Sequence, residues 1–177
     1  SKINSVTYSI DDSDSRSSKK SKKILNSKNI TVKTGLMRSQ VKNFYKKYIF
    51  SKKNYLPHVV GKLACSSNYY IFNNKGYISN NYSRKVAHLL RSKHQAILTS
   101  YKTINQDNPK LNCRIFGLEK FSPIRIILDK NLKLKINTFV IKTSKMTKTY
   151  IYHNSTNETK INKLKKKGVL LIKKKIT

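Results

Sequence analysis

Residues 86–114 read VAHLLRSKHQAILTSYKTINQDNPKLNCR, and this stretch decides the fold class. Together with the five residues before it, the start of this stretch has the apolar spacing of an amphipathic helix over residues 81–93. Asn80 or Asn81 can cap that helix. The run at 96–99 predicts a short buried strand. Residues 103–109 predict a loop, because the Asn-Pro step disfavours helix and Asp and Asn side chains bond to nearby backbone.

Further helices and strands are predicted on both sides of this stretch. Before it, a short helix is expected at 18–27 and a longer amphipathic helix at 37–50, with short strands near the N-terminus and at 30–32. After it, Ser155–Glu158 has capping-box spacing and opens a helix that stops at Gly168. The predicted strands of the C-terminal part are 58–65, 123–128, 138–141, 149–152 and 169–172. Alternating strands and helices from residue 58 onward indicate an α/β domain.

The amino-acid composition argues against a dedicated nucleic-acid-binding protein, a membrane-spanning protein and a disulfide-linked scaffold. The chain has 177 residues, with 39 Lys and Arg against 7 Asp and Glu, a formal net charge of +32. The basic residues are overwhelmingly Lys, which AT-rich codons favour together with Asn, Ile, Ser and Tyr, whereas nucleic-acid readout usually recruits Arg. No apolar run approaches the ~20 residues of a membrane-spanning helix. Two Cys and four dispersed His exclude a disulfide scaffold and give no metal-ligand spacing.

Three side chains stand out as candidates for ligand binding, each with a structural alternative. Asp107 could bond ribose or amide groups of a ligand, or could hold its own backbone in an Asx turn. Arg91 and Arg114 could converge to clamp a phosphate. Alternatively, Arg91 interacts with the free carbonyl groups at the C-terminal end of its helix, and Arg114 is solvated.

The 86–114 stretch closely resembles the pattern V-x-x-L-R-x-x-x-x-A-I-L-x-x-x-x-T-x-x-x-D-[DN]-P-x-L-x-x-R of the reductase domain of the bifunctional riboflavin-biosynthesis deaminase/reductase family. PHVVGKLA at 57–64 is similar to the first strand of that domain, and PIRIILD at 123–129 to a later strand. Upstream, VTYSIDDSDSRSSKK at 6–20 resembles the end of the deaminase domain. The resemblance covers nearly the whole chain in family order.

This resemblance implies an α/β fold like that of dihydrofolate reductase, and a division of the chain. Residues 1–35 would be the C-terminal tail of a cytidine-deaminase-like domain, 36–54 a connecting helix and linker, and 55–177 the first part of the reductase domain. The chain is expected to be an internal fragment. The zinc-binding motifs of the deaminase would precede residue 1, and a glutamate and a glycine-rich segment of the reductase would follow Thr177.

The implied activity is NADPH-dependent reduction of 5-amino-6-(5-phosphoribosylamino)uracil to the ribitylamino product. The cofactor-binding positions would be Ala64, Tyr77, Thr103, Asp107 and Lys130. The substrate-binding positions would be Lys75, Arg91, Leu111 and Arg114. Tyr77 stands where the family has Trp, Lys130 where it often has Ser, and Ser66–Tyr69 replaces a Ser-Leu-Asp-Gly turn.

The resemblance also implies the surroundings of the enzyme. The expected partner is the small phosphoribosylamino-pyrimidine substrate. Binding to a membrane is not expected, and binding to nucleic acid is expected only as nonspecific adhesion. Self-association into a homo-oligomer is one option. The location would be cytoplasmic, and zinc would belong only to the missing deaminase part. The alternative is a truncated, non-catalytic relative that acts as a basic nucleic-acid- or partner-binding protein.

Overall fold

The computed structural model describes residues 3–71 and 78–175. The chain forms two compact units, residues 1–61 and residues 62–177. Within the described residues, no helix has the length and apolar character needed to cross a bilayer.

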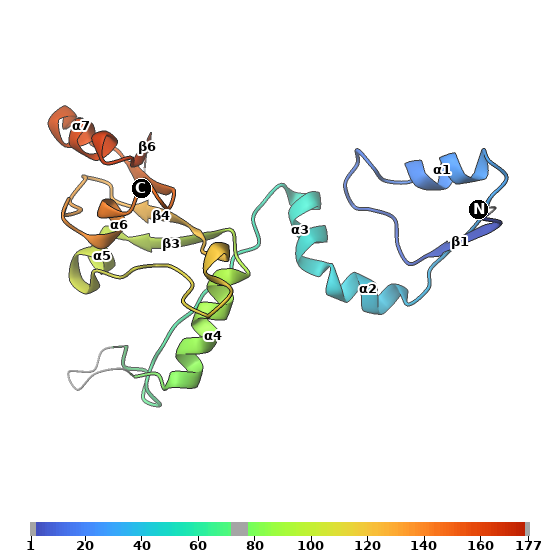
Figure 1. Ribbon diagram of the computed structural model, residues 1–177, viewed down its shortest axis with the longest axis horizontal. Helices are drawn as coiled ribbons and strands as arrows, with labels where there is room; N and C mark the ends of the chain where they lie inside the picture. The colour runs from blue at the N-terminus through green and yellow to red at the C-terminus, as the bar shows by residue number, and fades with distance from the viewer. Residues whose placement is uncertain (1–2, 72–77, 176–177) are drawn as a thin grey trace. The chain divides into compact units, whose positions relative to one another are not determined.

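The second unit is built on a four-stranded parallel sheet in the order β3-β4-β5-β6 (Figure 1). Its strands are β3 (Ala96–Ser100), β4 (Ile124–Leu128), β5 (Thr149–His153) and β6 (Leu170–Lys173). Between and before them lie α4 (Asn81–Ser92), α5 (Tyr101–Asp107), the 3-10 helix η1 (Glu119–Phe121), α6 (Phe139–Lys142) and α7 (Glu158–Lys166). In register, Ser100 pairs with Leu128 and Leu128 with Tyr152, so the carboxyl ends of three strands meet at one edge of the sheet.

The core lies on one face of this sheet. Ile127 and Ile151 project from β4 and β5 and are fully buried with Ile104 of α5 and Leu164 of α7. The opposite face is less covered, and Leu98 of β3 keeps 62% of its surface exposed. Alternate residues of β4 and β5 therefore differ in burial, as expected for a sheet packed mainly on one side.

The structure corrects four predictions of secondary structure. Residues 58–65 form no strand, and Val59 and Leu63 are exposed, because no described strand pairs with them. Residues 138–141 form the beginning of helix α6 instead of a strand. A run of four residues is too short for its apolar spacing to distinguish a helix from a strand. Within 103–109, residues up to Asp107 belong to α5, because packing of Ile104 in the core favours the helix. The predicted helix at 37–50 is two helices that meet at Tyr45.

The remaining elements of this unit follow the prediction closely. Asn80 caps α4, its side-chain oxygen accepting a hydrogen bond from the Ser83 amide at 2.8 Å. Asn157 caps α7 in place of the expected Ser155. Gly168 follows α7 with φ +89°, a left-handed conformation that favours glycine after a helix.

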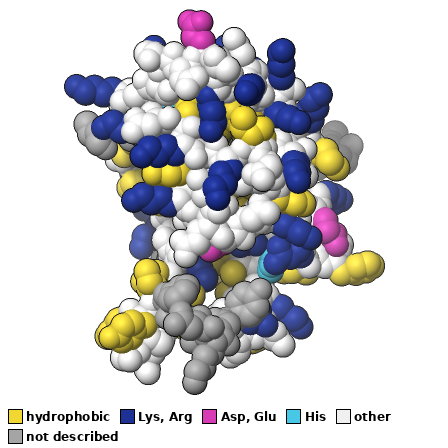
Figure 2. Space-filling view, turned by 90° about the vertical axis from the view of Figure 1, so that its left-hand side faces the viewer, with side chains coloured by type: hydrophobic (Ala, Val, Ile, Leu, Met, Phe, Trp, Pro, Cys, Tyr) yellow, Lys and Arg dark blue, Asp and Glu magenta, His cyan; other side chains and the backbone are white. Residues whose placement is uncertain are grey.

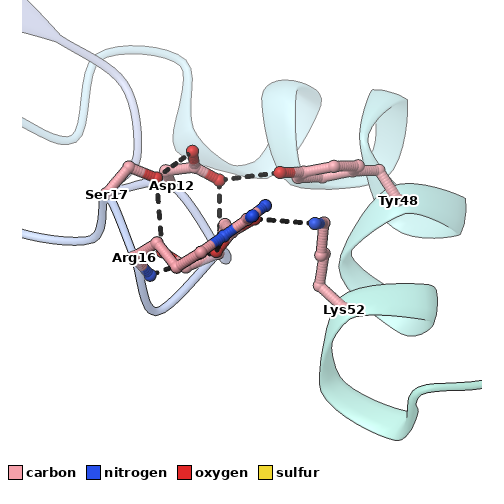
Figure 3. A network of polar contacts seen from close by, with 6 residues as sticks. Asp12, Arg16, Ser17, Tyr48 and Lys52 are labelled. Atoms are coloured by element: carbon pink, nitrogen blue, oxygen red, sulfur yellow. Dashed lines mark hydrogen bonds and ion pairs between the residues drawn. The ribbon is translucent and has the colours of Figure 1, made fainter.

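The first unit pairs β1 (Ser5–Tyr8) with β2 (Thr31–Thr34) in parallel, joined through α1 (Lys20–Asn26). The helices α2 (Arg38–Phe44) and α3 (Lys46–Asn54) follow. A polar network ties the turn after β1 to α3 (Figure 3). The Asp14 carboxylate lies 2.7 Å from the guanidinium of Arg16 and 2.7 Å from the ammonium of Lys52. The Asp12 carboxylate accepts hydrogen bonds from Ser17 and from the Tyr48 hydroxyl.

On the face that Figure 2 shows, the positive charge is spread rather than gathered. Figure 2 shows Lys and Arg side chains across the whole visible face, with hydrophobic side chains between them and few acidic ones. Nucleic-acid binders usually carry such charge as one patch or stripe. This face shows no such concentration.

Candidate functional site

Two of the predicted substrate residues, Arg91 and Arg114, are brought together in the second unit. Arg91 lies in the last turn of α4, one helical turn after His88. Residues three apart share one face of a helix, so His88 and Arg91 project together. Arg114 belongs to the loop after α5, and its backbone amide contacts the ring of His88.

Four anchors hold this loop against the domain. The Asn108 side-chain oxygen accepts a hydrogen bond from the Phe139 amide at 2.7 Å. The Lys110 carbonyl accepts one from the Arg125 guanidinium at 3.0 Å, and the Cys113 amide donates one to the Ser122 hydroxyl at 3.0 Å. The side chain of Leu111 is buried in the core. A loop fixed at so many points presents residues 112 and 114 in a defined position.

His88 and Asn112 connect the two arginines. The Arg114 amide donates to His88 Nδ1 at 3.2 Å, and Arg91 Nη1 lies 3.4 Å from the same nitrogen. Arg91 Nη1 also donates to the Asn112 carbonyl oxygen at 3.1 Å. The side-chain oxygen of Asn112 accepts a hydrogen bond from the Arg114 guanidinium at 3.4 Å. The two guanidinium groups therefore share one neutral partner, Asn112, which Arg91 bonds at the backbone carbonyl and Arg114 at the side chain.

The charges at this place are unbalanced. Partial burial lowers the pKa of Arg91, and the nearby charge of Arg114 lowers it further. Burial and the same two charges lower the pKa of His88 from its ordinary value of 6.5. Among the described residues, neither arginine forms an ion pair with a carboxylate. Two neighbouring cations without an acidic partner favour an anion, and guanidinium groups suit a phosphate.

Thr103 and Lys130, two predicted cofactor residues, lie at one edge of the sheet. Thr103 is in the first turn of α5, just after β3, and Lys130 follows the end of β4. Because these parallel strands end in register, both residues lie at their carboxyl ends, where ligands bind in open α/β sheets. Both side chains are exposed, as is Asp107 at the last residue of α5.

Two other predicted positions, Ala64 and Leu111, are less well placed to contact a ligand. Ala64 is half-buried in a segment without strand pairing. Since the Leu111 side chain is in the core, a contact with a ligand would involve its backbone. Lys75 and Tyr77 lie outside the described residues. Tyr69, which stands where the resemblance has glycine, adopts φ +64°, so the turn keeps the left-handed conformation without the glycine.

Two residues of the site were missed by the sequence analysis, namely His88 and Asn112. The only sequence signal for His88 is its spacing of three from Arg91 on a predicted helix. Asn112 carries no signal, since two of its three contacts use its backbone carbonyl, which every residue has. No group of three or more His, Cys, Asp or Glu is placed to hold a metal ion anywhere in the described part of the chain.

Comparison with known proteins gives consistent relatives. A family model described as "RibD C-terminal domain" matches residues 61–177. The riboflavin biosynthesis protein RibD of Bacillus amyloliquefaciens is 33% identical over 126 residues, which cover 70% of this chain and 33% of that protein. RibD of Chlamydia trachomatis is 28% identical over 174 residues, 96% of this chain and 46% of that protein. The chain therefore spans less than half the length of these curated relatives.

Solved structures show the same fold. Acinetobacter baumannii RibD superimposes with a TM-score of 0.80 at 18% identity, covering 98% of this chain and 49% of that one. A diaminohydroxyphosphoribosylaminopyrimidine deaminase/5-amino-6-(5-phosphoribosylamino)uracil reductase from Thermotoga maritima gives a TM-score of 0.74 at 22% identity, covering 96% of this chain and 53% of that one. The mixed α/β fold expected from the sequence is confirmed.

Proposed function

The chain belongs to the family of the RibD C-terminal domain, and from this premise we propose that it carries part of the site for NADPH-dependent reduction of 5-amino-6-(5-phosphoribosylamino)uracil in riboflavin biosynthesis. The full-length protein would be a bifunctional deaminase/reductase, with zinc only in the deaminase part. In this proposal residues 1–35 are the tail of the deaminase domain, 36–54 a connection, and 55–177 the first part of the reductase domain. A cytoplasmic location and self-association belong to the same proposal.

The observation that carries the proposal is the convergence of Arg91 and Arg114 around His88. The substrate is a phosphate monoester, and a pair of guanidinium groups can hold its phosphate through several charge-assisted hydrogen bonds. A rigid loop and a helix supply the two groups, so little conformational entropy is lost when the phosphate binds.

The residues at the sheet edge fit a phosphate-bearing dinucleotide. Lys130 offers a positive charge and Thr103 a hydroxyl group at the carboxyl ends of adjacent strands. Asp107 is exposed at the end of the same helix as Thr103 and can accept hydrogen bonds from ribose or amide groups. NADPH would supply the hydride. The task of the protein is to hold the sugar carbon of the substrate next to the hydride donor in the right orientation.

The family membership favours this proposal over a basic nucleic-acid-binding protein, and the spread of charge on the face in Figure 2 agrees with it. Nonspecific adhesion to nucleic acid at low salt remains expected from a net charge of +32.

The test is the replacement Arg114→Ala in the full-length protein. We expect kcat/KM for NADPH oxidation with the deaminated pyrimidine substrate to fall at least about tenfold, a loss of ~1.4 kcal/mol of transition-state stabilisation. Lys163→Ala, which removes an exposed charge from α7, serves as the control and should leave kcat/KM unchanged. An unchanged kcat/KM for Arg114→Ala would remove this arginine from the site.

A further inference from the structure

The proposed function uses the two arginines but assigns no role to the imidazole ring of His88, around which they converge. Its Nδ1 atom lies within 3.4 Å of three groups: the Arg114 amide, the Arg91 guanidinium and the Asn112 carbonyl oxygen. The first two are donors and the third is an acceptor. One ring nitrogen cannot both accept and donate, so the protonation of Nδ1 decides which contacts are bonds.

The surrounding partners favour an unprotonated Nδ1. The Asn112 carbonyl oxygen already accepts a hydrogen bond from Arg91 at 3.1 Å and does not need a proton from His88. The Arg114 amide, in contrast, has Nδ1 as its acceptor. A proton on Nδ1 would face this N–H and leave the amide without an acceptor, which is costly for a backbone donor.

The charges at the site favour the same state. A second proton on the ring would place a third positive charge beside Arg91 and Arg114, with no carboxylate paired to either arginine in the described residues. Burial of the ring and then these charges lower the pKa of His88, and they outweigh the Asn112 carbonyl, which acts in the opposite direction, so the neutral ring is the favoured form near pH 7. A neutral ring with an unprotonated Nδ1 carries its proton on Nε2.

We propose that His88 is a positioning residue, whose neutral Nε2–H imidazole accepts from the Arg114 amide and from Arg91 and so fixes the two arginines in one arrangement that binds a phosphate monoester. This inference rests on the proposed function of the arginine pair. His88 acts through the two arginines and is not itself assigned a contact with the substrate.

The protonation state is tested by NMR on the 177-residue chain labelled with ¹⁵N. Two-bond ¹H–¹⁵N correlations distinguish the two neutral tautomers from the imidazolium ion, and the signals of His88 are identified by their loss in His88→Asn. At pH 7.5 we expect the Nε2–H tautomer. A protonated Nδ1, in either the other tautomer or the imidazolium ion, would overturn the inference.

The positioning role is tested by binding of ribose 5-phosphate, measured by calorimetry. His88→Leu removes the acceptor, and we expect its affinity to fall about tenfold or more. His88→Asn places an amide oxygen near the position of Nδ1, so its affinity should stay within about threefold of the wild type. His94→Asn makes the same exchange at a histidine that bonds the Leu90 carbonyl instead, and should bind like the wild type.

The outcomes separate this inference from the proposed function. If His88→Asn binds as weakly as His88→Leu, or loses binding while circular dichroism shows a folded chain, the positioning role is refuted. Should His88→Leu fail to fold, the asparagine variant and the tautomer decide alone. A wild-type chain that carries the Nε2–H tautomer but does not bind ribose 5-phosphate contradicts the proposed function, and with it the phosphate part of this inference.

Discussion

At the scale of single residues, Arg125 is a basic group placed deep in the fold, with 1% of its surface exposed. Its guanidinium donates hydrogen bonds to the carbonyl oxygens of Val140 and Lys110 and to the Thr143 hydroxyl, at 2.8–3.2 Å. The group thus joins β4 to α6 and to the loop that carries Arg114. Burial lowers the pKa of Arg125, and the bonds to neutral oxygens offset part of its desolvation.

We expect Arg125→Lys to destabilise the second unit by roughly 2–3 kcal/mol, because a single ammonium group cannot reach three acceptors that a planar fork spans. Urea unfolding followed by circular dichroism measures this change. Lys163→Arg is the reverse exchange on the exposed surface of α7 and should alter the free energy of unfolding by less than about 0.5 kcal/mol. Equal effects of the two exchanges would show that the buried bonds of Arg125 contribute little.

The sequence allowed the two arginines of the site to be singled out but not the groups that connect them. Arg91 and Arg114 are conspicuous because Arg is rare in a chain dominated by Lys. The partner of His88 is a backbone amide 26 residues later, and every residue except proline has such an amide. A side-chain pattern therefore contains no information on this contact, which exists only once the loop after α5 is in place.

At the scale of elements, the predictions succeeded where burial and periodicity agree. β4 and β5 alternate between the buried face and the half-buried face, and both were predicted within a residue or two. α5 and α6 were missed because each is a short segment whose helical state depends on a core contact, through Ile104 in one and Val140 and Ile141 in the other. The expected strand at 58–65 needs a neighbour for its backbone hydrogen bonds, and none is present among the described residues.

The contact between the turn after β1 and α3 makes a testable contribution to acid stability. Hydrogen bonds from Arg16 and Lys52 hold the pKa of Asp14 well below its ordinary value of 3.8. A carboxylate with a lowered pKa in the folded state stabilises that state above the unfolded pKa, and this stabilisation is lost as the pH falls through the folded pKa. The window is therefore below about pH 4.

We expect Lys52→Met to raise the pKa of Asp14 toward its ordinary value, so that the melting temperature declines less between pH 5 and pH 2 than in the wild type. Lys53→Met removes the same charge from the neighbouring position, where the described residues show no ion pair to Asp14. That variant should keep the wild-type decline. Thermal unfolding at a series of pH values gives the comparison, and identical declines in the two variants would exclude a role for the Lys52–Asp14 pair.

At the scale of the whole molecule, repulsion between positive charges opposes folding. The chain carries 39 basic against 7 acidic residues. In the described residues only two ion pairs form, and both use Asp14. Salt screens attraction and repulsion alike, with a Debye length of about 10 Å at 0.1 M. Because few attractive pairs exist, screening acts here almost entirely on repulsion, which the compact state feels more strongly than the unfolded chain.

Stability should therefore rise with ionic strength, the opposite of what a protein held together by surface ion pairs shows. Between 20 and 300 mM sodium chloride we expect a gain of about 1 kcal/mol, equivalent to roughly 2–4 °C in the melting temperature for a chain of this size. Urea is the suitable denaturant because it is uncharged, whereas guanidinium chloride would itself screen the charges. A free energy of unfolding that stays constant or falls over this range would mean that the lysines are spaced widely enough for water to screen them already, and that the excess charge carries no penalty for the fold.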